Sequence, residues 1–252
     1  MIKLSAVIIT FNEERNMESC LQSLINVVDE IVVVDSYSTD ATKQICEQFE
    51  VKFIEHKFLG YIEQKNFALS QASHNHVVCL DGDESLSESL QFSILALKEE
   101  WHFDGYYANR LNNFCGQWIK HSDWYPNKKL RVFDRRKAKW TGINPHDHVE
   151  LHDKKAKTGH LKGDILHQTY QTYSEFNQKT EYFSSIAAQA YFDKGKTAPV
   201  WKIVWNPTWS FFKAYVLRLG FLDGFNGFVI SVQTANITFL KYSKLREFYK
   251  NA

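Results

Sequence analysis

Two carboxylates flank a glycine in Asp81-Gly82-Asp83, directly after the apolar run at residues 77–80. Carboxylate oxygens are ligands that Mg²⁺ and Mn²⁺ prefer, and such ions often hold substrate phosphates as well. The glycine lets a ligand approach the backbone closely. Asp-Gly is also a common turn. The position of the pair at the end of a predicted strand favours the metal site over the turn.

Polar residues also follow two earlier apolar runs. Thr10, Asn12 and Glu13 come after the run at residues 6–9, and Asp35 comes after the run at residues 31–34. In an open parallel sheet, ligands bind outside the carboxyl ends of the strands. The sequence therefore predicts one ligand pocket lined by these side chains. It has neither a GxGxxG nor a GxxxxGK[ST] motif, which argues against a dinucleotide site or a P-loop.

The elements that must hold these residues alternate between strands and helices. Strands are predicted at 6–9, 31–34, 52–54 and 77–80, and apolar residues at helical spacing predict helices between and after them. This alternation is typical of an α/β fold with a parallel sheet. Alternating residues at 104–157 predict hairpins that extend the sheet, and 161–167 predicts another strand. Helices follow Ser174, with breaks expected at Pro199 and Pro207.

The composition is that of a globular protein: 252 residues, 44% hydrophobic, 23% charged and a formal charge of +1. This balance excludes a disordered or collagen-like class and gives no reason to expect a nucleic-acid partner. The four cysteines form no CxxC pair, which favours reduced thiols. We find no cleavable signal peptide and no run of about 18 apolar residues, so the expected location is the cytoplasm.

Several segments carry a resemblance to a known family. AVIITFNEERNMESCLQSL, EIVVVDSYSTDAT, GYIEQKNFAL and VVCLDGDESL resemble the family 2 glycosyltransferases, which have the GT-A fold. WYPNKKLRVF, NPHDHVEL, LKGDILHQTY and AYVLRLGFLDGFNGFVIS are similar to the branch that adds sugars to the lipopolysaccharide inner core. The resemblance covers nearly the whole chain in order. It implies a GT-A sheet, mostly parallel and flanked by helices, with a helical C-terminal tail.

The resemblance also implies roles for individual residues. Thr10, Asn12 and Glu13 would line the nucleoside pocket, and Asp35 would contact the base. Lys65 would lie along the diphosphate, although an exposed helix lysine is the structural alternative. Asp81 and Asp83 would hold Mg²⁺ or Mn²⁺ against the donor. His167 would face the metal or the diphosphate, and a histidine ligand suits Mn²⁺ better than Mg²⁺.

An inverting transfer needs a base for the acceptor hydroxyl. The family places it in a His-Glu pair, and the matching stretch here is His146-Asp147-His148, so the pair has become His-Asp. Asp147 inherits the role, with a side chain one methylene shorter. His146, His148 or Glu150 stay open as the proton acceptor, and a buried structural aspartate is the other alternative.

Two further regions leave alternatives open. The basic block from Lys128 to Lys139 is either a solvated face or a seat for an anionic acceptor. The C-terminal helices carry Trp201, Trp205 and Trp209 with nearby lysines and arginines. Three alternatives stay open for these helices. They would contact the inner face of the cytoplasmic membrane, pack onto the core, or bind a second subunit in a homo-oligomer.

These observations predict a GT-A catalytic domain at residues 1–170 and a helical extension at 171–252. The predicted enzyme is a metal-dependent glycosyltransferase that inverts the anomeric carbon. It would use a nucleotide-sugar donor, with a UDP-sugar favoured, and a lipopolysaccharide core or another lipid-linked glycan as acceptor. A nucleotidyltransferase of similar fold and a non-catalytic nucleotide-sugar binding module are the rival hypotheses.

Overall fold

The computed structural model describes residues 1–144 and 146–251, with the backbone only for His146 and Asn251. The chain forms two compact units, each described here by itself. The first contains residues 1–110 and 127–168, and the second contains residues 111–126 and 169–252. The second unit thus includes residues 111–126, which the sequence analysis placed with the catalytic domain.

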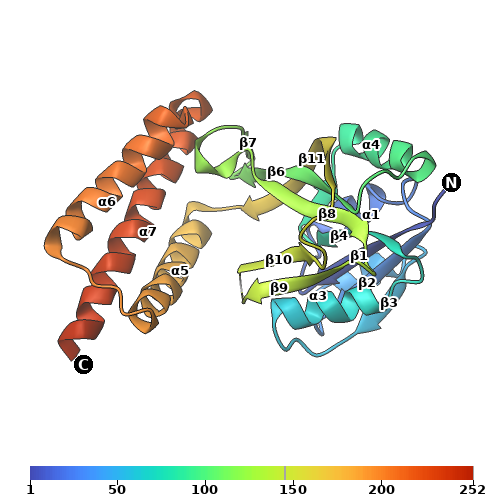
Figure 1. The fold of residues 1–252 in the computed structure, drawn as a ribbon, viewed down its shortest axis with the longest axis horizontal. Helices are drawn as coiled ribbons and strands as arrows, with labels where there is room; N and C mark the ends of the chain where they lie inside the picture. Colours follow the sequence, from blue (N-terminus) through green and yellow to red (C-terminus); the bar gives the residue numbers. More distant parts are fainter. Residues whose placement is uncertain (145, 252) are drawn as a thin grey trace. The chain divides into compact units, whose positions relative to one another are not determined.

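The first unit begins with four parallel strands, as predicted. They are β1 (Leu4–Thr10), β2 (Glu30–Asp35), β3 (Lys52–Glu55) and β4 (His76–Asp81), in the order β3-β2-β1-β4. The helices are α1 (Met17–Gln22), α2 (Thr42–Cys46), α3 (Tyr61–Ser70) and α4 (Glu88–Glu99) (Figure 1). The register aligns Thr10 with Asp35 and Ile9 with Asp81. The carboxyl ends of β1, β2 and β4 therefore meet at one edge.

The rest of the sheet is antiparallel, so it is mostly parallel only in its first half. Beyond β4 the order is β8 (Lys128–Asp134), β6 (Gly105–Phe114), β11 (Thr158–Tyr170) and β5 (Glu84–Leu86). A separate hairpin pairs β9 (Ala138–Ile143) with β10 (His146–Leu151). The antiparallel neighbours β4 and β8 are distant in the chain, and β6 is joined to β8 through β7 (Gln117–Ile119) and η1 (Ser122–Trp124).

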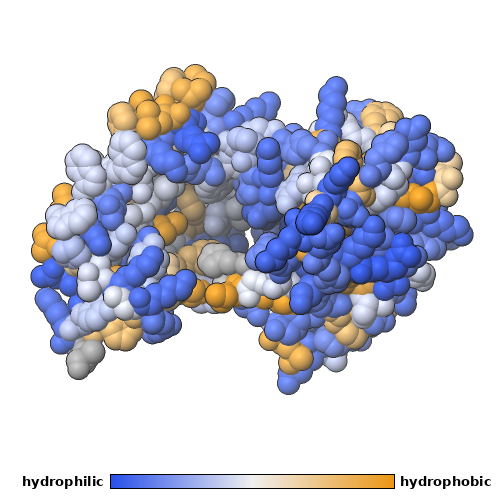
Figure 2. Space-filling model, viewed as in Figure 1, coloured by the Kyte–Doolittle hydropathy of each residue, from blue (hydrophilic) through white to orange (hydrophobic). Residues whose placement is uncertain are grey.

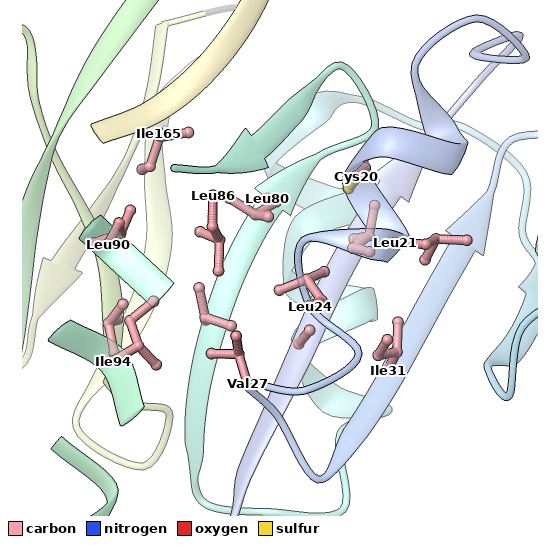
Figure 3. Close-up of a cluster of buried hydrophobic side chains, with 14 of the residues drawn as sticks. Cys20, Leu21, Leu24, Val27, Ile31, Leu80, Leu86, Leu90, Ile94 and Ile165 are labelled. Atoms are coloured by element: carbon pink, nitrogen blue, oxygen red, sulfur yellow. The ribbon is translucent and has the colours of Figure 1, made fainter. Parts of the chain in front are cut away.

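Both faces of this sheet are packed. Figure 3 shows one cluster, in which α1 places Cys20 and Leu21 beside Leu24, with Leu90 and Ile94 of α4 nearby. The other face of the sheet is covered by α3 and by Trp140 of β9. Strands buried on both faces are near-continuous apolar runs. The same property made β1, β2 and β4 recognisable in the sequence.

The second unit is largely helical. It contains β7 (Gln117–Ile119), which pairs with β6, and the short helices η1 (Ser122–Trp124), η2 (Lys213–Leu217) and η3 (Gly220–Asp223). Its long helices are α5 (Tyr173–Asp193), α6 (Val200–Phe212) and α7 (Gly224–Asn251). Pro207 lies inside α6, so the predicted break there is wrong. Packing of α6 against α7 holds the helix through the position that lacks a backbone N–H.

Candidate active site

The loops after β1 and β2 are joined by hydrogen bonds. The backbone N–H of Asn12 donates to Ser38 Oγ at 2.8 Å, and Asn12 Oδ1 accepts from the N–H of Thr39 at 2.8 Å. The N–H of Glu13 donates to Thr42 Oγ1 at 2.8 Å. The predicted pocket residues Asn12 and Glu13 therefore belong to one connected rim.

Asp35 lies at the end of β2 and is almost fully buried. Its two carboxylate oxygens accept from the N–H and the hydroxyl of Ser38. In this arrangement Asp35 orders the loop that follows β2. Contact of Asp35 with a base remains a prediction.

Gly82 lies directly against Thr10. A Cβ added to Gly82 would come within 2.8 Å of Thr10 Oγ1 and 3.2 Å of Glu13 Cγ, so only glycine fits. Within the described chain, Thr10 Oγ1 is buried and has no hydrogen-bond partner. A buried hydroxyl without a partner is unusual and costly. Thr10 and Gly82 thus form a tight junction between β1 and the Asp81-Gly82-Asp83 segment.

Lys65 of α3 connects two of the predicted site carboxylates. Its Nζ lies 2.9 Å from Asp81 Oδ1 and 2.8 Å from Asp147 Oδ2. The side chain of Lys65 is only 7% exposed, and its ammonium lies 4.4 Å from the centroid of the Trp140 ring. The alternative of an exposed helix lysine is therefore wrong. Residues from three elements, α3, β4 and β10, meet at this ammonium.

Arg131 of β8 is a site residue that the sequence analysis did not single out. Its Nη2 lies 3.2 Å from Asp81 Oδ2 and 3.1 Å from Glu84 Oε1, and its side chain is only 4% exposed. Arg110 of β6 approaches the same Glu84 oxygen at 3.5 Å. Alternation alone predicts that Arg131, between Leu130 and Val132, faces solvent, so the local sequence contained no signal for it. The register shift between β6 and β8 at this point accompanies its burial.

The charges shift one another's protonation equilibria. Burial alone would raise the pKa of Asp81, but Lys65 and then Arg131 hold that pKa well below its usual value. Burial alone would lower the pKa of Lys65, but Asp81 offsets this and the net shift is upward. Burial also opposes the charge of Arg131, whose pKa is nevertheless raised by Glu84 and Asp81. All three groups are therefore charged at neutral pH.

Asp83 lies beside His167, as the metal prediction requires. His167 Nε2 is 3.2 Å from Asp83 Oδ2, and the N–H of Gln168 donates to the Asp83 carbonyl at 3.0 Å. Asp81 is placed with two cations instead, although its Oδ1 is buried without hydrogen-bond geometry to any described donor, including Lys65 at 2.9 Å. Among the described residues no three His, Cys, Asp or Glu side chains form a ready metal site.

This donor set fits a metal that also binds substrate. Mg²⁺ is commonly held by one or two carboxylates, with waters and substrate phosphates completing its shell. Asp83 and His167 supply an oxygen and a nitrogen, and the Oδ1 atom of Asp81 lacks a donor. The three side chains that the sequence analysis named are consistent with such an ion only when a substrate contributes further ligands.

Asp147 differs from the neighbours considered as the base. It lies on β10 opposite Gly142 and its side chain is 11% exposed, whereas His148 and Glu150 are exposed to solvent. The side chain of His146 lies outside the described atoms. Of the described alternatives, Asp147 is the one that contacts Lys65.

The basic block from Lys128 to Lys139 is not one surface. Arg136 pairs with Asp134, Lys137 pairs with Asp104, and Arg135 donates to the carbonyl of His74. The interpretation of the block as a single acceptor seat is therefore wrong, because strand alternation and the turn after β8 send its side chains in different directions.

Lys129 is a half-buried member of this block that lies near Arg110 and Arg131. It pairs in register with Ala108, which puts it diagonally opposite Arg110 on the same face. Burial, then Arg110 and Arg131, lowers the pKa of Lys129 to about 8. Three cationic side chains therefore lie close to the site carboxylates.

Comparison with known proteins identifies the family. Residues 5–151 match the model of "Glycosyl transferase family 2". The chain belongs to glycosyltransferase family 2. This match includes every site residue named above except His167, and the predicted α/β GT-A fold is confirmed.

Relatives extend the similarity beyond the catalytic strands. An "Uncharacterized glycosyltransferase" of Rickettsia felis is 33% identical over 98% of this chain and 90% of its own length. The "Lipopolysaccharide core biosynthesis glycosyltransferase LpsC" of Rhizobium meliloti is 28% identical over 97% of this chain and 92% of its own length. The crystal structure of S. aureus TarS 1-349 in complex with UDP-GlcNAc has 15% identity and a TM-score of 0.47, covering 99% of this chain and 92% of that one.

Proposed function

We propose that this family 2 glycosyltransferase transfers a sugar from a UDP-sugar to a saccharide acceptor with inversion at the anomeric carbon. The observation that carries the proposal is the cluster around Lys65, which gathers Asp81 and Asp147 at one edge of the sheet. Asp83 follows Asp81 after a single glycine, Gly82. A donor site and a base would therefore lie side by side.

Donor binding is assigned to the rim and to the Asp81-Gly82-Asp83 segment. Thr10, Asn12 and Glu13 would bound the nucleoside, and Asp35 would contact the base or order the loop that does. Asp83 and His167 would hold Mg²⁺ or Mn²⁺, which would neutralise charge on the diphosphate leaving group. The Asp81 carboxylate would chiefly position Lys65 and Arg131, because it forms ion pairs with both cations.

Asp147 would take the proton of the attacking acceptor hydroxyl. Lys65 donates to Asp147 Oδ2, so the other oxygen, Oδ1, is the proposed proton acceptor. Lys65 would hold the carboxylate in one orientation, which matters because a base must lie within hydrogen-bond distance of the proton it removes. A single displacement with one base inverts the anomeric carbon.

The proposed acceptor is a lipopolysaccharide core saccharide or another lipid-linked glycan. The support is the similarity to the relative named for lipopolysaccharide core biosynthesis, which extends over 97% of this chain. The proposed location is the cytoplasm.

The decisive experiment identifies the product that is released from the nucleotide-sugar donor. The purified chain is incubated with UDP-sugars, a core oligosaccharide acceptor and Mg²⁺ or Mn²⁺, and UDP and pyrophosphate are both quantified. We expect UDP only, loss of release on chelation, and an inverted anomeric centre in the product by NMR. Pyrophosphate release would indicate a nucleotidyltransferase, and donor binding without release would indicate a binding module.

Asp83→Ala tests the metal assignment in the same assay. Removing the ligand should reduce UDP release by at least about 10²-fold. The melting temperature should stay close to that of the parent, since Asp83 is a partly exposed loop residue. Asp193→Ala, an exposed carboxylate on α5, is the matched control and should retain full activity. Parent-level turnover of Asp83→Ala in saturating metal would disprove the assignment.

A further inference from the structure

The outward face of α6 is apolar, which is the reverse of an ordinary surface helix. Exposed residues recur along α6 and into η2 at helical spacing, and nearly all are hydrophobic. We name them the aromatic face: Trp201, Val204, Trp205, Trp209, Phe212 and Val216. A helix on the surface of a globular protein normally presents polar residues to solvent. No residue of α6 is fully buried.

The same character continues where α6 passes into α7. The segment from η2 to the first residues of α7, which we name the elbow, exposes Leu217, Leu219, Phe221, Leu222 and Phe225. Figure 2 shows strongly hydrophobic residues gathered at this end of the second unit. Contiguous exposed apolar surface of this kind marks an interaction site with a protein or a membrane.

The charge around these residues selects between those partners. From residue 194 to residue 246 the chain has eight lysines and arginines and one acid, Asp223. Asp223 is buried, where it accepts from the N–H groups of Lys120 and His121. The segment that contains the aromatic face is therefore rich in cations, although the whole chain has a formal charge of only +1. Acids from other parts of the second unit pair with three of them: Asp123 with Lys213 and Arg218, and Glu181 with Lys244.

Individual cations lie close to the apolar side chains. Lys202 Nζ lies 5.5 Å from the centroid of the Trp201 ring. At the elbow, Lys213 and Arg218 share a single partially exposed partner, Asp123, at 3.3 Å and 3.7 Å. Tryptophan at the headgroup level, with lysine and arginine heads directed to water and phosphate, is typical of helices that lie in a membrane interface.

No single straight helix in the described part of the second unit has the properties of a membrane span. Among residues 1–144 and 146–251, no single helix has the length and apolar composition needed to span a bilayer. The stretches Val200–Leu217 and Gly220–Lys250 pass that test only together, and they are bent by 71° at their junction. Docking on the surface and insertion as a bent hairpin are therefore the two arrangements that an experiment must separate.

We propose that the aromatic face and the elbow form a docking surface for a membrane that contains anionic phospholipids. The rings would enter the headgroup region, and the surrounding lysines and arginines would bind lipid phosphates. The proposal concerns the second unit alone and does not depend on the donor or acceptor chemistry assigned to the first.

The test is flotation of the full chain with phosphatidylcholine vesicles that contain from 0 to about 40 mol% phosphatidylglycerol. Anionic headgroups attract basic protein segments near the membrane surface, so their content is varied. We expect recovery with the vesicles to increase with anionic content and to fall as salt is raised. The chain should leave the vesicles in alkaline carbonate. Retention in carbonate would show an inserted hairpin and overturn docking on the surface.

Matched variants separate insertion of these rings from non-specific adsorption of any exposed apolar residue. Trp205→Ser removes a ring that is 62% exposed, and Phe92→Ser removes one on α4 that is 64% exposed. Trp201→Ser combined with Trp205→Ser should weaken vesicle binding about tenfold or more, because each ring contributes apolar burial in the interface. Phe92→Ser should bind like the parent.

The competing occupant is a second copy of the chain, which sedimentation in the absence of vesicles would detect. A stable dimer that Trp201→Ser with Trp205→Ser dissociates, together with no vesicle binding by the parent, would overturn the proposal. Unchanged vesicle binding by the double variant would also overturn it. Circular dichroism of each variant establishes that the helices are intact, and these exposed rings contribute little to the core.

Discussion

Lys65 holds together carboxylates that come from distant parts of the chain. Its ammonium contacts Asp81 and Asp147, which repel each other in its absence. Such an ion cluster gives Lys65 a structural role in addition to the one proposed for it in the site. Removing one member of a buried ion cluster leaves the remaining charge uncompensated, and this costs more than the pair contributes when intact.

We expect Lys65→Met to destabilise the fold by about 1–3 kcal/mol at pH 7, a value reduced for the partial exposure of both carboxylates. The depressed pKa of Asp81 contributes stability above its unfolded value of 3.8, and this contribution is lost as pH falls below that value. The difference between parent and variant should therefore shrink at pH 3. Urea melts at the two pH values measure it.

A double-mutant cycle with Asp147→Asn separates the roles of the pair. If Lys65 acts by holding Asp147, the two substitutions together should slow transfer little more than Asp147→Asn alone. Full additivity of the losses would show that Lys65 acts on the donor independently of Asp147.

Lys129 destabilises the folded state, in contrast to Asp81. Burial and neighbouring arginines lower its pKa to about 8 from 10.5, so its charged form is disfavoured in the folded state. Below pH 8 the lysine is charged in both states and the folded state bears the penalty. As pH rises from about 8 to 10.5 the unfolded state holds the extra proton, and stability increases.

Lys129→Met should therefore be more stable than the parent at pH 7, by about 1 kcal/mol after allowance for solvent screening. The gain should disappear near pH 10, where Lys129 is already neutral in the folded protein. Urea melts at both pH values measure the difference, with exposed Lys128→Met as control. An equal gain at both pH values would show that the methionine stabilises by apolar contact and not by relief of repulsion.

At the level of elements, the strands that position the site were predictable because they lie in the middle of the packed sheet. β1, β2 and β4 are buried on both faces, so they are continuous apolar runs that end in polar residues. The same endings singled out Asp81 and Asp83 as candidate site residues. Because β1, β2 and β4 are parallel, the polar residues that follow them lie at one edge of the sheet, and this inference needs no knowledge of distant contacts.

The antiparallel half was less accessible to sequence reasoning. Arg131 reaches Asp81 only because β8 pairs with β4, and this pairing joins residues about fifty positions apart in the chain. A local pattern contains no information about such a partner. The two alternatives for the basic block stayed open for the same reason, since its side chains separate only once β8 and its turn are folded. The path of α6 through Pro207 likewise depends on packing against α7.

Gly82 shows how one junction between elements constrains a residue. The backbone there needs no glycine conformation, but Thr10 leaves no space for a Cβ. Gly82→Ala should destabilise by about 1–3 kcal/mol through overpacking and should weaken UDP binding. Adding Thr10→Ala should recover part of the stability by restoring space. No recovery in urea melts would mean that the alanine acts elsewhere.

At the level of the whole molecule, the chain contains two units with separate cores. Leu24 lies in a core of the first unit, and Leu245 lies with Ala188 and Ala198 in a core of the second. The sequence analysis separated a helical C-terminal region from the catalytic sheet. Residues 111–126 were placed with the catalytic sheet, because no local pattern shows that Phe114 and Ile119 join the core of the second unit through contacts with residues 176 and 230.

The separate cores predict distinguishable unfolding. Leu245→Ala should cost about 2–5 kcal/mol, as expected for a buried leucine, and should lower the melting transition of the second unit. Leu24→Ala should lower the transition of the first, which UDP binding identifies by raising it. Calorimetry follows both. A single transition that both substitutions shift equally would show that the units unfold as one.

The hydrogen-bonded rim around β1 and β2 bears on the cost of capturing a nucleoside. Asn12, Ser38 and Thr39 already fix these loops before any ligand arrives. Ordering a mobile loop takes free energy away from binding, and a preorganised loop avoids this loss. If this rim binds the nucleoside as proposed, these loops should keep their conformation on binding, and little chain entropy should be lost.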